Sequence, residues 1–183
     1  MRIEVKNESL ELLRKAVNIA HEEIRVAVKR LNAELILELG KQPEAMYELS
    51  SGTFEELVAE LLEDMGYDVK LTPRTRDGGR DIIAVFKLPH ADILTIVDCK
   101  HFAKHRKIGP DIVQRLLWVA DRNDKASQAM LVTTSSFTSG SKIIEKEYKW
   151  KLSLKDFNDI KVWLSQYGKW QSTENPRLWL PDS

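Results

Sequence analysis

The sequence predicts an α/β domain, a mixed sheet flanked by helices, with a helical extension before it. Two short β-branched runs, 82–86 and 93–100, are joined by a short proline-containing connector, which predicts an antiparallel hairpin. A further apolar run, 129–133, follows a helical segment and therefore predicts a strand parallel to an earlier one. Helices alternate with strands along the rest of the chain, an order typical of a sheet covered by helices.

The first element is a long amphipathic helix from about Glu8 to Leu39, which Gly40 and Pro43 should end. Such a helix cannot bury its apolar stripe alone. It either folds back near Asn32 as a helical pair, packs on the rest of the chain, or forms a coiled coil with a second copy, which would make a homodimer. The stripe recurs at spacings of three and four residues and consists of Leu13, Val17, Ala20, Ile24, Ala27, Leu31 and Leu35.

A second helix, 54–65, carries one apolar stripe and an acid at its edge. Thr53 and Glu56 match a capping box, which gives Glu56 a structural role. At about 100° per residue, Glu55 lies at the edge of the stripe, so it is the acid able to face a site beside the sheet. The alternative is that Glu55 only borders the core. Gly66 should supply the C-cap.

The remaining elements follow from the same periodicities. The hydroxyl-rich segment 134–139 precedes a helix, where such side chains more often cap the helix than bind a phosphate. The predicted elements are a strand over Tyr67–Leu71, a helix from Asp111, a helix near Lys142–Tyr148, a strand over Lys151–Leu154 and a helix over Lys155–Tyr167.

Composition bounds the class of protein. The 183 residues include 28 basic and 28 acidic side chains, so no global field attracts DNA, although a local basic patch suffices for binding. The single cysteine, Cys99, excludes an internal disulfide and indicates a reducing compartment. We find no apolar run of the kind that a signal peptide or membrane helix needs. We therefore expect a cytoplasmic protein that is not associated with a membrane.

Two aspartates and a lysine converge at one end of the hairpin. The connector's symmetry pairs Phe86 with Ile93, and the same register sets Asp81 opposite Asp98, with Lys100 on the same face. Opposed carboxylates repel unless a cation lies between them. Mg²⁺ prefers such oxygens, and a neighbouring lysine can hold an attacking water or stabilise charge on a phosphate.

The alternative for these residues is a solvated hairpin end, whose ion pairs would contribute at most ~1 kcal/mol each. Strand 93–100 is apolar on both faces, which is typical of a central strand covered by helices. Charges at the end of a buried strand are costly without partners or a function. The composition of the strand therefore favours a functional site.

Five motifs occur in the order found in one family. From about residue 49 to 167 the sequence resembles the Mrr-type restriction endonuclease domain of the PD-(D/E)xK nuclease superfamily, which implies a restriction-endonuclease-like fold. On this basis we expect a helical extension over 1–48, a nuclease domain over 49–168 and a tail over 169–183. The motifs are Phe54-Glu55, Gly66-Tyr67, Asp77-Gly78-Gly79-Arg80-Asp81, Asp98-Cys99-Lys100 and Leu131-Val132-Thr133-Thr134-Ser135-Ser136-Phe137-Thr138.

The resemblance implies a role for each charged residue. Asp81 would be the metal-binding aspartate, Asp98 the second acid and metal ligand, and Lys100 the catalytic lysine, with Glu55 assisting from the helix. Mg²⁺ is the expected cofactor, with Mn²⁺ as an alternative. Two positions depart from the family's pattern, because Asp98 replaces the usual Glu or Gln and Arg80 replaces proline.

Substrate contacts are expected from the residues around this cluster. Arg76, Gly79 and Arg80 precede the first aspartate, and Lys104 belongs to a basic segment, 101–107, that follows Lys100. They would contact the DNA backbone. Alternatively, the arginines only pair with nearby acids, the glycine only makes a turn, and the basic segment is only solvated.

The sequence thus predicts a Mg²⁺-dependent DNA endonuclease of the restriction or defence type. Two alternatives stay open. One is a catalytically inactive module that keeps the fold for binding DNA or protein, and the other is a structure-specific, junction-resolving nuclease that acts as a symmetric dimer.

Overall fold

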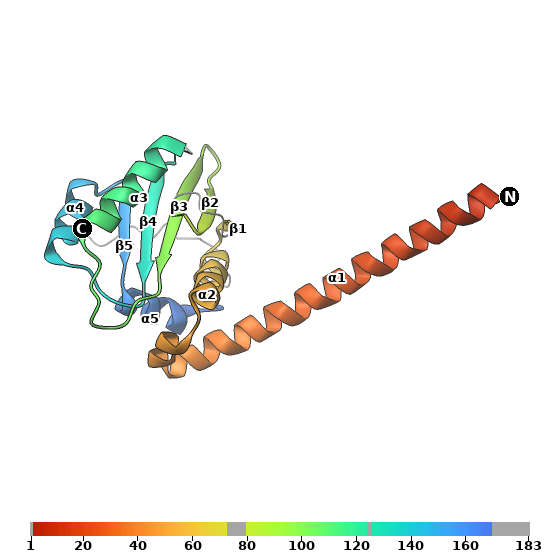
Figure 1. The fold of residues 1–183 in the computed structure, drawn as a ribbon, viewed down its shortest axis with the longest axis horizontal. Helices are drawn as coiled ribbons and strands as arrows, with labels where there is room; N and C mark the ends of the chain where they lie inside the picture. Colours follow the sequence, from red (N-terminus) through yellow and green to blue (C-terminus); the bar gives the residue numbers. More distant parts are fainter. Residues whose placement is uncertain (1, 73–79, 124–125, 170–183) are drawn as a thin grey trace. The chain divides into compact units, whose positions relative to one another are not determined.

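The structure, a computed structural model, describes residues 2–72, 80–123 and 126–169 (Figure 1). The chain divides into two compact units, residues 1–36 and 37–183. Except for its first residue, the expected tail over 169–183 lies outside the described residues.

The N-terminal helix α1 runs without interruption over Arg2–Lys41. The proposal that it folds back near Asn32 is therefore wrong. No glycine or proline precedes Gly40, and a single asparagine costs a helix less than ~1 kcal/mol, so nothing in this stretch breaks the helix. Within the described residues, no helix has the length and apolar content that crossing a membrane requires.

Five strands form one mixed sheet, as predicted. Their order across the sheet is the order in the chain, with β3 in the centre. The first three strands are antiparallel and the last three are parallel, which Figure 1 shows in the directions of the arrows. The strands are β1 (Asp68–Leu71), β2 (Ile82–Lys87), β3 (Asp92–Lys100), β4 (Gln128–Thr133) and β5 (Leu152–Lys155).

Helices cover both faces of this sheet. Side chains of α3 and α4 form one hydrophobic core with β3, β4 and β5, in which Ile96, Leu116 and Leu131 are fully buried. In Figure 1, α3 crosses this face of the sheet. Helix α2 contacts β1, β2 and β3, and α5 contacts β5. The helices are α2 (Ser51–Asp64), α3 (Pro110–Asn123), α4 (Ser139–Glu147) and α5 (Phe157–Gln166), and a 3₁₀ helix, η1 (Pro43–Glu48), precedes α2.

Both ends of α2 carry capping residues, but the N-cap is not the predicted one. Ser50, not Thr53, caps the helix, because its side chain accepts the backbone N–H of Thr53 at 3.0 Å. The helix thus begins three residues earlier than expected, and Glu56 is exposed. At the other end the C-cap residue is Met65, and the predicted glycine follows it, since Gly66 has φ +94° and its N–H donates to the carbonyl of Glu63.

We predict that Ser50→Ala lowers the free energy of unfolding by about 1 kcal/mol, because it leaves the Thr53 N–H without its acceptor. Urea denaturation measures the change. Ser51→Ala is the matched control, since Ser51 is the first helical residue and the N-cap is Ser50. Equal effects of the two substitutions would contradict the assignment of Ser50 as the cap.

Candidate active site

The predicted hairpin brings Asp81 to the carboxyl end of β3. Its register is confirmed, with Phe86 opposite Ile93. Asp81 lies immediately before β2, and its backbone N–H donates to the carbonyl of Val97 at 2.9 Å. The regular pairing ends there, so the prediction that Asp81 faces Asp98 within the ladder is wrong. Asp81 instead bonds to Val97, which is already the ladder partner of Ile82, so the register shifts by one residue at this point.

Side-chain contacts nevertheless bring the three charged residues together. The Oδ2 of Asp81 accepts the backbone N–H of Cys99 at 2.7 Å, which places this carboxylate beside the neighbouring Asp98. The Nζ of Lys100 donates to Oδ1 of Asp98. The side chain of Asp98 is 1% exposed and that of Lys100 is 17% exposed. The cluster therefore lies at the carboxyl end of the central strand, where Asp98 is buried and Lys100 is partly exposed.

Burial dominates the electrostatics of Asp98. Loss of solvent raises its pKa to about 7, the ammonium of Lys100 opposes this shift, and the carboxyl of Asp81 adds to it. Among the described residues, Oδ2 of Asp98 is buried and has no hydrogen-bond partner. An unpartnered carboxylate oxygen in this position is costly, so it calls for a proton or a cation.

Cys99 and Glu55 border the same cluster. Burial and the charges of Asp81, Asp98 and Glu55 raise the pKa of the Cys99 thiol well above its usual value, which makes it a poor nucleophile. Glu55 on α2 is half-buried, and its charge acts on Cys99. Its burial, with Glu56 exposed, agrees with the place at the edge of the apolar stripe that the helix periodicity predicts.

The cluster fits a hard divalent cation. The free Oδ2 of Asp98 and the adjacent carboxylate of Asp81 are oxygen ligands of the type that Mg²⁺ and Mn²⁺ prefer. The described part of the chain holds no group of three or more His, Cys, Asp or Glu residues arranged for a metal. Asp81 and Asp98 would therefore hold a cation as two carboxylates, and water and phosphate oxygens would supply its other ligands, as is common for Mg²⁺.

Of the four residues expected to bind substrate, the structure describes two, Arg80 and Lys104. Arg76 and Gly79 lie outside the described residues. Arg80 is half-buried, and its carbonyl accepts the hydroxyl of Thr72 at 2.8 Å. Lys104 is exposed in the segment that follows Lys100.

Hydroxyl side chains beside the site have a role that the sequence did not reveal. Thr138 caps α4, as predicted, by accepting the N–H of Ser141 at 3.3 Å. Thr133, however, donates to the carbonyl of Lys100 at 2.7 Å. The sequence predicted that β4 is parallel to an earlier strand, but it did not predict the register. The contact follows from that register, which pairs Lys100 with Thr133.

Comparison with known families identifies this architecture. The restriction endonuclease family model Mrr_cat matches residues 46–164. The chain therefore belongs to this family of restriction endonucleases, and the resemblance noted from its motifs is confirmed. Residues 46–164 form a nuclease domain of the restriction endonuclease type, a fold that generally uses divalent metal ions.

Individual relatives agree on the fold. The uncharacterized protein y4cE of Sinorhizobium fredii is 29% identical over 159 residues, which are 84% of this chain and 40% of the relative. The DNA modification-dependent restriction endonuclease AspBHI has a TM-score of 0.55 at 21% identity, covering 79% of this chain and 37% of its own. MspJI restriction endonuclease, solved with a 27-mer oligonucleotide, has a TM-score of 0.51 at 18% identity, covering 76% and 33%. The chain thus spans about two-fifths of its curated relative.

We predict that Asp98→Asn stabilises the metal-free protein in a pH-dependent way. The folded-state pKa of Asp98 is raised from 3.8 to about 7, so its protonation stabilises the fold fully below pH 4, and this contribution is lost as pH rises to 7. The unfolding free energy of the variant relative to wild type should therefore rise by up to about 4 kcal/mol between pH 4 and pH 8.

Urea denaturation in EDTA at both pH values measures this difference. Asp92→Asn is the matched control, because Asp92 is exposed at the other end of β3. A difference between Asp98→Asn and wild type that does not change with pH would contradict the burial argument.

Proposed function

We propose that this chain is a metal-dependent DNA endonuclease that hydrolyses phosphodiester bonds and acts in the cytoplasm in restriction or defence against foreign DNA. The supporting observation is the cluster of Asp81, Asp98 and Lys100 at the end of β3, in a chain of a restriction endonuclease family. Mg²⁺ is the proposed ion, with Mn²⁺ as an alternative, because both prefer oxygen ligands.

Each residue of the cluster has a distinct proposed role. Asp81 and Asp98 would hold the cation, and the backbone N–H of Cys99 keeps the carboxylate of Asp81 oriented for this. A bound divalent cation lowers the pKa of water and offsets the charge that develops on a phosphate. Lys100, held by Asp98, would donate to the attacking water or to a phosphate oxygen. Glu55 would assist from α2.

The burial of Asp98 links metal binding to pH. Without a cation, the raised pKa keeps a large fraction of this carboxyl protonated near neutrality. A ligand must be deprotonated before it binds a metal, so binding should strengthen as pH rises through about 7. The ammonium of Lys100, bonded to the other oxygen, favours the ionised form that the metal requires.

DNA is the proposed substrate. AspBHI is a DNA modification-dependent enzyme and MspJI was solved with an oligonucleotide, which supports a nucleic-acid substrate for the shared fold. We propose backbone contacts from Arg80 and Lys104, together with Arg76 and Gly79 of the preceding segment. Contacts of this kind position the duplex without reading its sequence.

The N-terminal helix is proposed to pair two copies of the chain. Leu13, Val17, Ile24 and Leu31 repeat at coiled-coil spacing along α1. Large apolar side chains at this spacing are typical of a helix that packs against a second helix.

We predict that the purified chain cleaves plasmid DNA when Mg²⁺ or Mn²⁺ is added and not in EDTA. Lys100→Ala and Asp81→Ala should lower the rate by roughly a hundredfold or more, because each removes a group that stabilises charge or holds the cation. Agarose gels under single-turnover conditions measure cleavage. The matched controls are Lys87→Ala and Asp92→Ala, which change exposed residues paired at the far end of the hairpin.

Failure of the wild-type chain to cut duplex, methylated or branched DNA with either ion would favour a non-catalytic binding module. Cleavage confined to branched DNA would favour a junction-resolving nuclease.

We predict that the chain sediments as a dimer and that Ile24→Glu makes it a monomer, because a buried carboxylate in a helix pair is costly. Sedimentation velocity distinguishes the two states. Asn18→Glu is the matched control, since Asn18 lies on the polar side of α1. A monomeric wild-type chain would refute pairing through this helix.

A further inference from the structure

Three consecutive hydroxyl side chains at the end of β4 hold the backbone that follows the catalytic cluster. We call residues 133–135 the hydroxyl run. Its first member donates to the carbonyl of Lys100 at 2.7 Å, and its third donates to the carbonyl of Lys104 at 3.2 Å. Between them, the hydroxyl of Thr134 accepts the N–H of Phe102 at 2.9 Å and donates to its carbonyl at 2.7 Å.

The side chains that make these bonds are buried. Thr133, Thr134 and Ser135 are 0%, 0% and 3% exposed. Backbone groups of an irregular segment need partners, and the hydroxyl run supplies those that a neighbouring strand would otherwise give. Thr95 on β3 provides the contrast, because its hydroxyl is equally buried but has no hydrogen-bond partner among the described residues.

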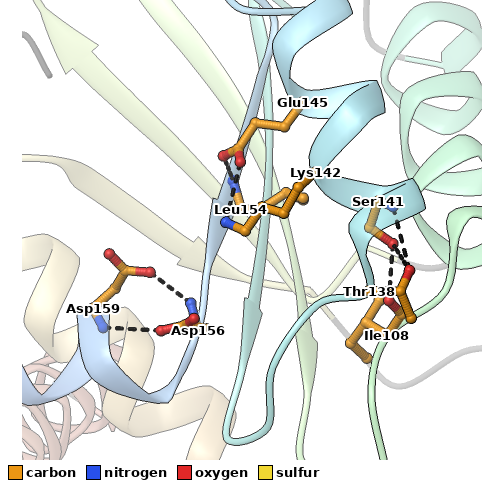
Figure 2. A network of polar contacts seen from close by, with 8 residues as sticks. All are labelled: Ile108, Thr138, Ser141, Lys142, Glu145, Leu154, Asp156 and Asp159. Carbon is orange, nitrogen blue, oxygen red and sulfur yellow. Dashed lines mark hydrogen bonds and ion pairs between the residues drawn. The ribbon is translucent and has the colours of Figure 1, made fainter.

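The far end of the same segment is also fixed. The N–H of Ile108 donates to the carbonyl of Ser136 at 2.9 Å, and the N–H of Thr138 donates to the carbonyl of Ile108 at 3.0 Å. The hydroxyl of Ser141 donates to that carbonyl as well, at 2.8 Å, and Figure 2 shows Ile108, Thr138 and Ser141 together at the start of α4. The basic segment, 101–107, is therefore held at both ends.

The basic segment presents its charges outward from this anchored backbone. Lys104, Arg106 and Lys107 are exposed. The guanidinium of Arg106 lies over the ring of Phe102, 3.8 Å from its centroid. Thr134 thus holds the main chain of the residue whose ring contacts this guanidinium.

We propose that the hydroxyl run is a positioning element that keeps the basic segment preformed as a docking surface for the phosphates of DNA. This inference rests on the proposed endonuclease function. Phosphate contacts from lysine and arginine provide most nonspecific affinity for DNA. A segment that is already ordered avoids the cost of ordering its side chains and backbone when DNA binds.

Thr134→Val tests the proposal, because valine keeps the shape of threonine and removes both hydrogen bonds to Phe102. Thr95→Val is the matched control at a buried threonine without a bond. Amide hydrogen exchange at Phe102 in the free protein should become at least about tenfold faster in the first variant, because the N–H no longer has its acceptor, and stay unchanged in the second.

DNA binding is then measured by fluorescence anisotropy with a labelled duplex in EDTA across a range of salt concentrations. Thr134→Val should weaken binding at low salt and make the salt dependence shallower by about 0.9 in log–log slope for each phosphate that the protein no longer neutralises. In cleavage assays, KM should rise more than kcat falls. The double variant Lys104→Gln/Lys107→Gln should also show a shallower salt dependence, but its amide exchange at Phe102 should stay as in the wild type.

Each result decides between the possibilities. Unchanged amide exchange, or an unchanged salt slope in Thr134→Val, overturns the positioning role even if the chain cuts DNA. If Thr134→Val does not fold, the double variant Lys104→Gln/Lys107→Gln tests the docking surface. Binding of DNA by that variant as tightly as by the wild type overturns the proposal. A wild-type chain that neither binds nor cleaves DNA overturns the proposed function and the docking surface together.

Discussion

The burial of one carboxyl group, that of Asp98, determines how the whole site is built. It closes a strand that is central in the sheet and covered on both faces, so its charge has little water around it. One oxygen is bonded to Lys100, and the other has no partner among the described residues. A group held in this way is expensive for the fold unless a proton or a cation relieves it. The cation of the proposed function would remove this cost.

The surrounding residues supply what this carboxyl lacks. Antiparallel pairing of β2 and β3 delivers Asp81 from a neighbouring strand, and a single backbone N–H, from Cys99, orients its carboxylate. The sheet provides this geometry through main-chain bonds, which do not depend on side-chain identity. The thiol of Cys99 remains protonated beside these charges because burial raises its pKa. The buried thiol of Cys99 therefore lies on β3 between two residues of the charged cluster, Asp98 and Lys100.

Much of this arrangement could be predicted from local sequence signals. The short connector fixed the hairpin register, and the two apolar faces of strand 93–100 indicated its central position. Helix periodicity separated Glu55 from Glu56 correctly. The N-cap of α2 could not be chosen in the same way, because Ser50, Ser51 and Thr53 all carry a suitable hydroxyl and only the path of the chain selects among them.

Other features depended on contacts between distant segments. The one-residue shift at Asp81 is a property of the strand end, where the ladder no longer imposes its repeat. The bonds from Thr134 to Phe102 join residues 32 positions apart, and they require the parallel register of β3 and β4. Hydroxyl-rich sequence before a helix suggested only capping, which describes Thr138 and leaves its upstream neighbours unexplained.

The hydroxyl groups of residues 133–135 bond main-chain atoms of Lys100, the last residue of β3, and of Phe102 and Lys104, which follow it. The path of the segment that follows β3 is thus held by hydroxyl groups at the end of β4. Because these bonds reach main-chain atoms, substitutions of the outward side chains of this segment would leave them in place. The charge of this surface can therefore be altered separately from the path of the chain beneath it.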